Sequence, residues 1–379
     1  MRVQLDDMKR KILCIHQSAE LYGSDRSFLS AILALKKSNV TDIVLPFSGE
    51  LSSILDESGA QVTYFKDGIL RKNDVKKPIV FCCQTLRGVF FYFKKFKDYE
   101  IIYINTIVML SAILASAGYR FSSKKIICHI REIPSRKQMF FFKALFRISG
   151  VELAFNSEAT KKAFNLPGTV IYNGVDDIGG YTTPRRNELR NTSKVKLLLV
   201  GRINTWKGHE LLIDAIINNY LRIGENSVEL DIVGSPFEGY EYLEDKLKKK
   251  VEKYKLSKHI RFIPFTKDPE QYFVSTDYVV VPSTKPEPFG RVAAEAFSAG
   301  KPVIAANHGG LAEIVTNMQD GYLFEPNNEN ELAKILDDIT KASKEEYMRM
   351  SECARNTYTS KFSLEIYQEK INSLVSGNS

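Results

Sequence analysis

Apolar residues fall along the first half of the chain in short continuous runs of strand length. These runs cover Lys11–His16, Asp42–Pro46, Ile101–Ile104 and Lys125–Ile130. A glycine-containing loop, Glu20–Asp25, precedes a stretch with helical spacing, Ser27–Leu35. Continuous apolar strands that alternate with helices predict a parallel sheet covered on both faces.

The second half repeats this pattern. Strands are predicted at Val195–Val200, Val228–Val233, His259–Ile263, Tyr278–Val281 and Pro302–Ala305, and helices at Gly208–Asn219 and Leu243–Tyr254. The stretch Gly179–Asn187 has the composition of a linker. We therefore predict two α/β, doubly wound, Rossmann-like domains that face a cleft, residues 1–180 and 187–363. Open sheets of this kind bind ligands beyond the carboxyl ends of their strands.

The composition is that of an ordinary globular protein. The 379 residues are 44% apolar and 26% charged, and no apolar run reaches the roughly 18 residues of a membrane span. The polar N-terminus lacks a signal-peptide pattern. The five cysteines are an odd number and have neither zinc nor redox spacing. We expect a reducing, cytoplasmic location.

The positive charge is concentrated in the first half. Residues 1–180 hold 26 Lys and Arg against 17 Asp and Glu, whereas the whole chain has a net charge of +8. The first domain is therefore expected to meet an anionic surface or acceptor.

Two carboxylates mark the loop and helix that follow the run 278–281. Gly300 and Pro302 predict the end of a helix from about Phe289 to Ala299, and Pro288 suits its first turn. Glu287 comes just before this helix and Glu295 lies about two turns inside it. A carboxylate accepts two hydrogen bonds from a vicinal diol, so the pair can hold two sugar rings.

Two cations follow the run 195–200. Gly201 lets the backbone turn closely, and Arg202 and Lys207 lie between a strand end and a helix start. A planar guanidinium and an ammonium together suit a diphosphate. The chain has neither a P-loop nor a Gly-x-Gly-x-x-Gly turn after its first strand.

These residues resemble glycosyltransferase family 4, a retaining family with the GT-B fold. The matching motifs are Gly201-Arg202 with Lys207-Gly208, Glu287-Pro-Phe-Gly290, Glu295, Gly300-x-Pro-Val-Ile304 and Val170–Asp176. The loop Leu21–Ser27 resembles members that build bacterial surface polysaccharides such as O-antigen and capsule. The resemblance also implies that a last helix, about 364–379, crosses back onto the first domain.

The resemblance implies a role for each matching residue. Arg202 and Lys207 hold the donor diphosphate, Glu295 binds the ribose, and Glu287 contacts the transferred sugar with the backbone of Phe289 and Gly290. Gly23 and Ser24 would line a phosphate or acceptor loop. The family often has Gly-Gly at this point, whereas this chain has Tyr22-Gly23.

The implied function is a retaining glycosyltransferase, a hexosyltransferase in bacterial lipopolysaccharide or capsule synthesis. Its donor is a nucleotide-sugar and its acceptor a glycan or an undecaprenyl-diphosphate-linked glycan. No Asp-x-Asp occurs, so we expect no cofactor and no metal, with Arg202 and Lys207 stabilising the leaving diphosphate. A sugar-nucleotide epimerase, a phosphorylase and a non-catalytic nucleotide-sugar-binding protein remain as alternatives.

Four residues at predicted strand ends of the first domain are acceptor-side candidates. His129 lies where the resemblance places a cleft histidine, which can contact the transferred sugar or pass the acceptor proton; a core or capping histidine is the alternative. Arg131 and Glu132 are candidate acceptor contacts or a surface ion pair. Asn105 ends the run 101–104.

Two segments combine aromatic and basic residues, Phe90–Lys97 and Arg136–Arg147. Such segments can lie peripherally in an anionic inner-leaflet interface, and a lipid-linked acceptor would require this. The alternative is that the rings face the core and the cations are solvated. No motif for nucleic-acid binding is present.

Overall fold

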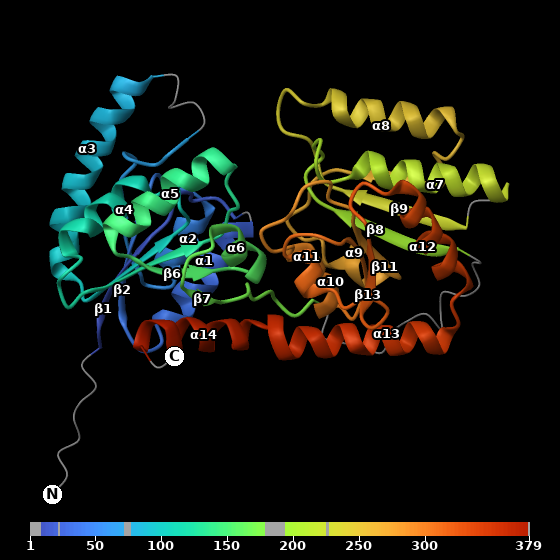
Figure 1. Ribbon diagram of the computed structural model, residues 1–379. Coiled ribbons are helices and arrows are strands. Elements are labelled where there is room, and N and C mark those ends of the chain that lie inside the picture. The colour runs from blue at the N-terminus through green and yellow to red at the C-terminus, as the bar shows by residue number, and fades with distance from the viewer. Residues whose placement is uncertain (1–8, 22, 72–76, 179–193, 225–226, 378–379) are drawn as a thin grey trace, which may run out of the picture. The chain divides into compact units, whose positions relative to one another are not determined.

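The computed structural model describes residues 9–21, 23–71, 77–178, 194–224 and 227–377. The chain forms two compact units (Figure 1). The first contains residues 1–174 and 364–379, and the second contains residues 175–363.

The first unit is built on a seven-stranded parallel sheet in the order β3-β2-β1-β4-β5-β6-β7. Its strands are β1 (Lys11–Ile15), β2 (Val40–Leu45), β3 (Gln61–Tyr64), β4 (Ile101–Asn105), β5 (Lys125–Ile130), β6 (Glu152–Phe155) and β7 (Thr169–Val170). Every residue of β4 is buried, and so is every residue of β5 after Lys125, because helices cover both faces of the sheet.

Each face of this sheet has its own apolar core. One core joins α3 (Pro78–Lys95), α4 (Leu110–Ser116), α5 (Arg136–Ser149) and α6 (Glu158–Phe164). The other joins α1 (Gly23–Leu35), α2 (Glu50–Glu57) and α14 (Leu364–Ser376). The helix α14 lies along α1 although more than 300 residues separate them in sequence (Figure 1).

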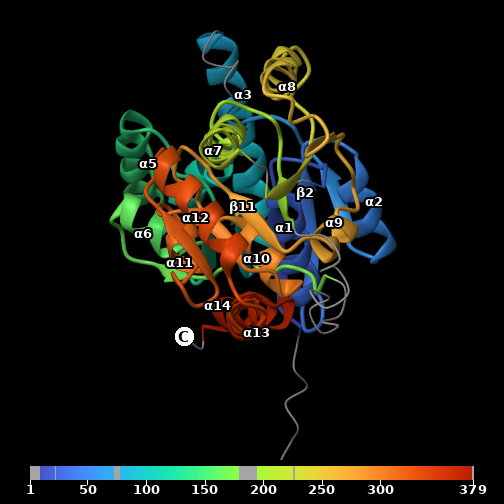
Figure 2. The same ribbon diagram turned by 90° about the vertical axis from the view of Figure 1, so that its right-hand side faces the viewer.

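The second unit has a six-stranded parallel sheet in the order β10-β9-β8-β11-β12-β13. Its strands are β8 (Val195–Val200), β9 (Val228–Val233), β10 (Ile260–Ile263), β11 (Tyr278–Val281), β12 (Val303–Ala306) and β13 (Gly321–Phe324). Its helices are α7 (His209–Ile223), α8 (Tyr242–Lys253), α9 (Glu270–Ser275), α10 (Arg291–Ser298), α11 (Leu311–Ile314), α12 (Glu329–Lys341) and α13 (Lys344–Thr357). The helices α7 and α8 lie side by side (Figures 1 and 2), where Lys250 pairs with Glu210 and Asp214 at 2.8 Å each.

The predicted two-domain α/β fold is confirmed, but several bounds differ. The sequence did not reveal β3, β6, β7 and β13. The helix predicted over 289–299 begins later, at Arg291, because Gly290 has a φ of 109° and stands outside it. Pro288 therefore precedes the helix and does not lie in its first turn, which corrects our prediction.

The domain boundary also differs from the prediction. Residues 175–178 belong to the second unit, where the Val175 N–H donates to the Phe362 carbonyl at 2.9 Å and the Ile178 N–H donates to Ser298 Oγ at 3.2 Å. The predicted linker 179–187 lies outside the described residues.

Candidate functional site

The second unit changes winding direction between β8 and β11, its central neighbours. Such a switch point is where an open α/β sheet leaves room for a ligand beyond the carboxyl ends of its strands. The loops 201–208 and 282–290 leave the sheet there. They carry three of the charged residues predicted from the sequence, Arg202, Lys207 and Glu287.

Lys207 and Glu287 are brought together from these two loops. Lys207 Nζ lies 2.8 Å from Glu287 Oε1, and the two side chains are 18% and 9% exposed. The hydroxyl of Ser283 donates to the same carboxylate oxygen. A charge pair this sheltered requires good geometry and further hydrogen bonds to offset its desolvation, and Ser283 supplies one.

Backbone contacts hold Lys207 in place. The side-chain oxygen of Asn204 accepts hydrogen bonds from the backbone N–H groups of Trp206 (3.0 Å) and Lys207 (2.9 Å). The Thr284 N–H donates to the Trp206 carbonyl at 2.7 Å, which joins the two loops. Sequence reasoning missed Asn204, Ser283 and Thr284. Thr284 meets Trp206 across 78 residues, whereas Asn204 and Ser283 bond to residues two to four positions away, in loops without a distinctive local pattern.

A third loop, after β12, closes around Glu287. The His308 Nε2–H donates to the Ser283 carbonyl at 2.8 Å. The Gly310 N–H donates to the Glu287 carbonyl at 2.8 Å. Glu287 is thereby fixed through its backbone as well as its side chain, and it is 7% exposed.

The other predicted donor-site residues have different partners. The guanidinium of Arg202 stacks on the ring of Phe237, 3.8 Å from its centroid. Glu295 accepts from Arg291 Nε at 2.7 Å, one turn earlier in α10. Phe289 is buried, with its ring 5.8 Å from that of Phe362. Thus Lys207 and Glu287 contact each other. Arg202 instead stacks on Phe237, and Glu295 pairs with Arg291.

His209, the first residue of α7, stays neutral near neutral pH. Burial and then the charge of Lys207 lower the pKa of His209 to about 4. The cationic character of this region therefore comes from Lys207 and Arg202.

The first unit carries a buried polar network at its own switch point, between β1 and β4. His16 follows β1 and lies 2.6 Å from Asp25 through Nε2. The other ring nitrogen of His16 is 2.8 Å from the Asn105 amide nitrogen. Arg131 Nε donates to the Asn105 side-chain oxygen at 2.5 Å. All four side chains are buried.

His129 and Arg131 share the end of β5. His129 Nδ1 is 2.6 Å from the Tyr103 hydroxyl, and burial followed by the charge of Arg131 lowers its pKa well below the usual value. Thr106 turns the chain beside them with a φ of 81°, a strained conformation for a β-branched residue, and its N–H donates to the His129 carbonyl at 2.9 Å. Such strain gathers at functional sites.

Three predictions for the first unit change with the structure. Gly23 and Ser24 lie in the first turn of α1, which begins four residues earlier than predicted, and Tyr22 lies outside the described residues. Arg131 is buried at 6% exposure and donates to neutral oxygens. It is therefore no member of a surface ion pair. Glu132 accepts from the Arg131 N–H at 3.2 Å, and burial raises its pKa to about 7.

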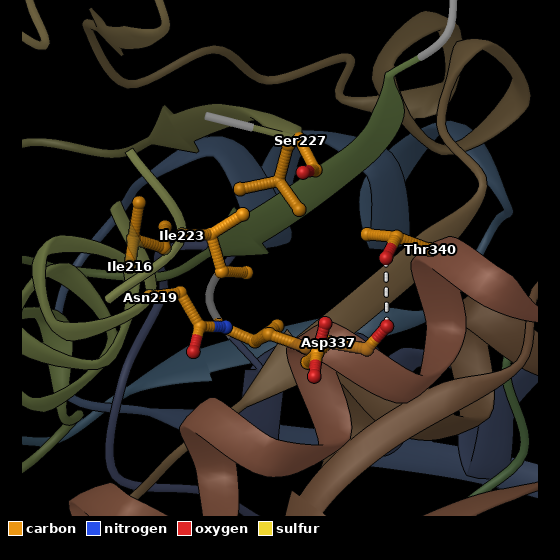
Figure 3. A pocket seen from close by; sticks show the side chains of 8 residues that line it. Ile216, Asn219, Ile223, Ser227, Asp337 and Thr340 are labelled. Atoms are coloured by element: carbon orange, nitrogen blue, oxygen red, sulfur yellow. Dashed lines mark hydrogen bonds between the residues drawn. The ribbon is translucent and has the colours of Figure 1, made fainter. Parts of the chain in front are cut away.

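A small hollow in the second unit lies away from this chemistry. Figure 3 shows it between α7, α12 and the start of β9. Its lining comprises Ile216, Asn219, Ile223, Ser227, Val228, Leu336, Asp337 and Thr340. It lies at the amino-terminal end of β9, where Val228 lines it. Lys207 and Glu287 lie at the opposite edge of the sheet, beyond the carboxyl ends of β8 and β11. With about 10 Å³ it has room for about one water molecule.

Two further features are absent from the part of the chain that the structure describes. It contains no group of three or more His, Cys, Asp or Glu side chains placed to hold a metal ion. None of its helices has both the length and the apolar character needed to cross a bilayer.

Residues 181–357 match the family described as Glycosyl transferases group 1. The matched region contains the loops that carry Lys207 and Glu287. The lipopolysaccharide 1,2-N-acetylglucosaminetransferase of Salmonella typhimurium is 33% identical over 177 residues, 45% of each chain. The D-inositol 3-phosphate glycosyltransferase of Jonesia denitrificans is 32% identical over 166 residues, 41% of this chain and 38% of its own length. The chain thus spans less than half the length of each of these two relatives.

The fold of the whole chain is that of solved GT-B structures. The Anabaena protein HepE, crystallised in complex with UDP, superposes with a TM-score of 0.79 over 97% of this chain and 100% of its own, at 23% identity. Such a likeness at low identity establishes the fold and leaves the substrate open. The GT-B fold expected from the sequence is confirmed for both units.

Proposed function

We propose that this chain is a glycosyltransferase of the retaining type that moves a hexose-type sugar from a nucleotide-sugar to an acceptor glycan. The observation that carries the proposal is the Lys207–Glu287 pair at the switch point of the second unit. The group 1 match covers this region, and HepE has been crystallised with UDP-glucose.

The pair suggests how the donor is engaged. Lys207 is bound to Glu287 in the chain alone. A diphosphate carries more negative charge than one carboxylate and competes for the Lys207 ammonium. Glu287 is then released toward the sugar hydroxyls, while Lys207 and Arg202 stabilise the charge that develops on the departing nucleotide.

Variants of this pair test the proposal. Lys207→Met and Glu287→Gln should each lower transfer, followed as nucleotide release from UDP-, GDP- or dTDP-sugars, by about 10²–10³-fold, the range for a lost electrostatic contact in a transition state. Lys285→Met, an exposed cation in the same loop, is the matched control. Wild-type rates in both variants would refute the site.

Product analysis separates transfer from the other activities of this fold. NMR of the product should show the anomeric configuration of the donor. An epimerised nucleotide-sugar, or donor binding in a thermal-shift screen with no turnover at all, would instead favour an epimerase or a binding protein. A ligand at 100 times its Kd stabilises by about 2.7 kcal/mol, which such a screen detects.

We also propose that the reaction needs no metal ion, because Lys207 and Arg202 supply cationic charge at the expected diphosphate position. Turnover should survive excess EDTA. A complete loss that Mg²⁺ restores would overturn this part of the proposal and leave the sugar-transfer activity standing.

The acceptor is proposed to be a glycan or an undecaprenyl-diphosphate-linked glycan of lipopolysaccharide or capsule synthesis. The relative from Salmonella acts on lipopolysaccharide according to its name. The peripheral membrane location that a lipid-linked acceptor requires is supported by α3. This helix exposes Ile79 (80%), Leu86 (64%) and Phe90 (61%).

These α3 side chains form an apolar stripe. Ile79, Cys83, Leu86, Phe90 and Phe93 follow one another at spacings of four and three residues, which places them on one helical face, and all are exposed. The aromatic residues of this segment divide between two environments, since Tyr92 and Phe96 face the core. In α5, likewise, Phe140 is exposed and Phe146 buried.

Basic side chains accompany the α3 stripe. The Lys94 ammonium lies 4.4 Å from the centroid of the Phe90 ring. Exposed apolar residues with neighbouring cations favour an anionic lipid interface.

Liposome flotation tests this surface. The chain should float with vesicles that contain anionic phosphatidylglycerol and much less with neutral phosphatidylcholine vesicles. The double change Leu86→Glu and Phe90→Glu should abolish flotation. Leu221→Glu, at a residue 65% exposed on α7, should not. Equal flotation of all three proteins would refute the assignment of the stripe.

A further inference from the structure

The His129 ring in β5 is held by two neighbours at a single nitrogen. Its Nδ1 lies 2.6 Å from the Tyr103 hydroxyl and 3.4 Å from Arg131 Nη2. The whole residue is buried. These two contacts determine where the ring carries its proton.

A guanidinium has only hydrogen-bond donors. An atom that Arg131 Nη2 contacts must therefore accept, so Nδ1 presents its lone pair. Arg131 Nη2 also lies 3.5 Å from the Tyr103 oxygen and donates toward it. Tyr103 is thus left to donate its own proton to Nδ1, and the single proton of the neutral ring resides on Nε2.

The position of Arg131 is itself fixed from three other directions. Its Nε donates to Asn105, its Nη1 to Asn173, and its Nη2 to the Tyr367 hydroxyl at 3.0 Å. Tyr367 comes from α14 and donates its proton to the Ser27 carbonyl at 3.0 Å, which leaves its oxygen free to accept from Arg131.

The other hydrogen bonds of the network have a defined direction for the same reason. Arg131 donates to Asn105, so the Asn105 amide nitrogen donates to His16 Nδ1, and the His16 Nε2–H donates to Asp25. The cation and the carboxylate are therefore the two ends of one chain of hydrogen bonds with neutral groups between them. Turning the guanidinium away from His129 would break this chain.

The second ring nitrogen of His129 has no such neighbour. Among the described residues, no hydrogen-bond partner contacts the buried Nε2. A buried N–H without a partner destabilises the chain, so a partner supplied by a bound molecule would be favoured there.

We infer that His129 is a fixed, neutral Nε2–H donor toward an oxygen of the bound substrate, held in this tautomer by Tyr103 and Arg131. It does not accept the acceptor's proton. Tyr103, Arg131 and Tyr367 are positioning residues that act through the ring. The hydrogen bond from His129 to the substrate rests on the proposed sugar transfer, whereas the tautomer of the ring does not.

Nitrogen-15 NMR of histidine-labelled protein tests the tautomer directly. The chain has only five histidines, and the His129→Gln variant assigns one pair of ring signals. We expect the shifts of a neutral Nε2–H ring, unchanged from pH 5.5 to 8.5. A ring protonated at Nδ1, or one that titrates near pH 6.5, would overturn the inference.

The Tyr103→Phe variant tests the positioning role. Loss of the hydroxyl should add an Nδ1–H population to the His129 signals while the chain stays folded. Tyr367→Phe keeps Nδ1 paired with Tyr103 and should shift the tautomer less. An unchanged Nε2–H ring in Tyr103→Phe would show that Tyr103 has no such role.

Turnover measurements test the hydrogen bond from His129 to the substrate. Glutamine can donate a hydrogen bond and leucine cannot, so His129→Gln should keep kcat/KM within about 10-fold, while His129→Leu should lose about 10-fold more, the effect of one hydrogen bond. Equal losses, with an acid limb of the wild-type pH profile that both variants abolish, would mark His129 as a general base. If the wild type transfers no sugar, the proposed function fails and the NMR result still decides the tautomer.

Discussion

Glu132 directly follows Arg131 at the end of β5, and the burial that raises its pKa to about 7 makes the ionised form unfavourable in the folded chain. Its ordinary pKa of about 4.5 applies when the chain is unfolded. The folded chain therefore binds more protons between these two values. Stability should be full below about pH 4.5 and should fall as the pH rises to about 7.

The Glu132→Gln variant removes this dependence. At pH 8 the variant should be more stable than the wild type by on the order of 1–2 kcal/mol, and at pH 4.5 the two should be equal. Urea midpoints at both pH values measure the difference. Glu57→Gln, at an exposed residue of α2, is the control and should leave the midpoint unchanged. A variant that is less stable than wild type at pH 8 would contradict the role of burial.

For single residues, the sequence identified charged residues of the candidate site more reliably than the side chains that contact them. Lys207 and Glu287 could be predicted because each lies in a recognisable motif at a strand end. Ser283, Tyr103 and Tyr367 could not, since a serine or a tyrosine has no distinctive local pattern. Tyr367 meets Arg131 across 236 residues, a contact that only the packing of α14 creates.

The helix α7 is bounded by two glycines with the same backbone conformation. Gly208 and Gly224 both have a φ of 78°. A Cβ at Gly208 would lie 1.9 Å from the Pro282 carbonyl oxygen, whereas a Cβ at Gly224 would meet nothing within 4 Å. The loop that carries Lys207 thus depends on a close approach between two backbones at Gly208.

Alanine substitutions at the two ends of α7 separate conformation from contact. Gly224→Ala should lower the free energy of unfolding by about 1 kcal/mol, through the positive φ alone. Gly208→Ala should lower it by about 3 kcal/mol or more and should also weaken donor binding, because Lys207 is adjacent. Thermal denaturation and a donor titration measure both effects. Equal losses in the two variants would contradict the contact with Pro282.

Two of the four strands that the sequence did not reveal, β7 and β3, are too short or too exposed to be recognised. β7 has only two residues, and β3, at the edge of its sheet, is nowhere fully buried. Neither produces a continuous apolar run. The central strands β1, β4 and β8 do, because both of their faces are covered. Helix ends shifted where a glycine with positive φ, such as Gly290, interrupted a pattern that otherwise continued.

For the whole molecule, α14 belongs to the first unit although it follows the second in sequence. Tyr367, Ile371, Leu374 and Val375 are buried in the core that it shares with α1 and α2. The first unit should therefore lose stability when α14 is damaged, and the second should not.

Calorimetry can follow the two units separately. Ile371→Ala should lower the stability of the first unit by about 2–5 kcal/mol, the range for a deleted core isoleucine. The transition of the second unit should be the one that a bound nucleotide-sugar shifts, and it should stay in place. Glu369→Ala, exposed on the same helix, is the control. If Ile371→Ala instead lowered the temperature of the nucleotide-sensitive transition, α14 would stabilise the second unit, contrary to the prediction.

The return of the chain to its first unit also sets an order of events during synthesis. Domains generally fold in the order in which they leave the ribosome. Here the sheet of the first unit emerges early, but the helix that covers α1 is translated only after the entire second unit. Until then the apolar residues of α1 that α14 covers lack this partner. A chaperone that holds such surfaces should bind nascent chains that end before Leu364 and release those that extend past Ser376.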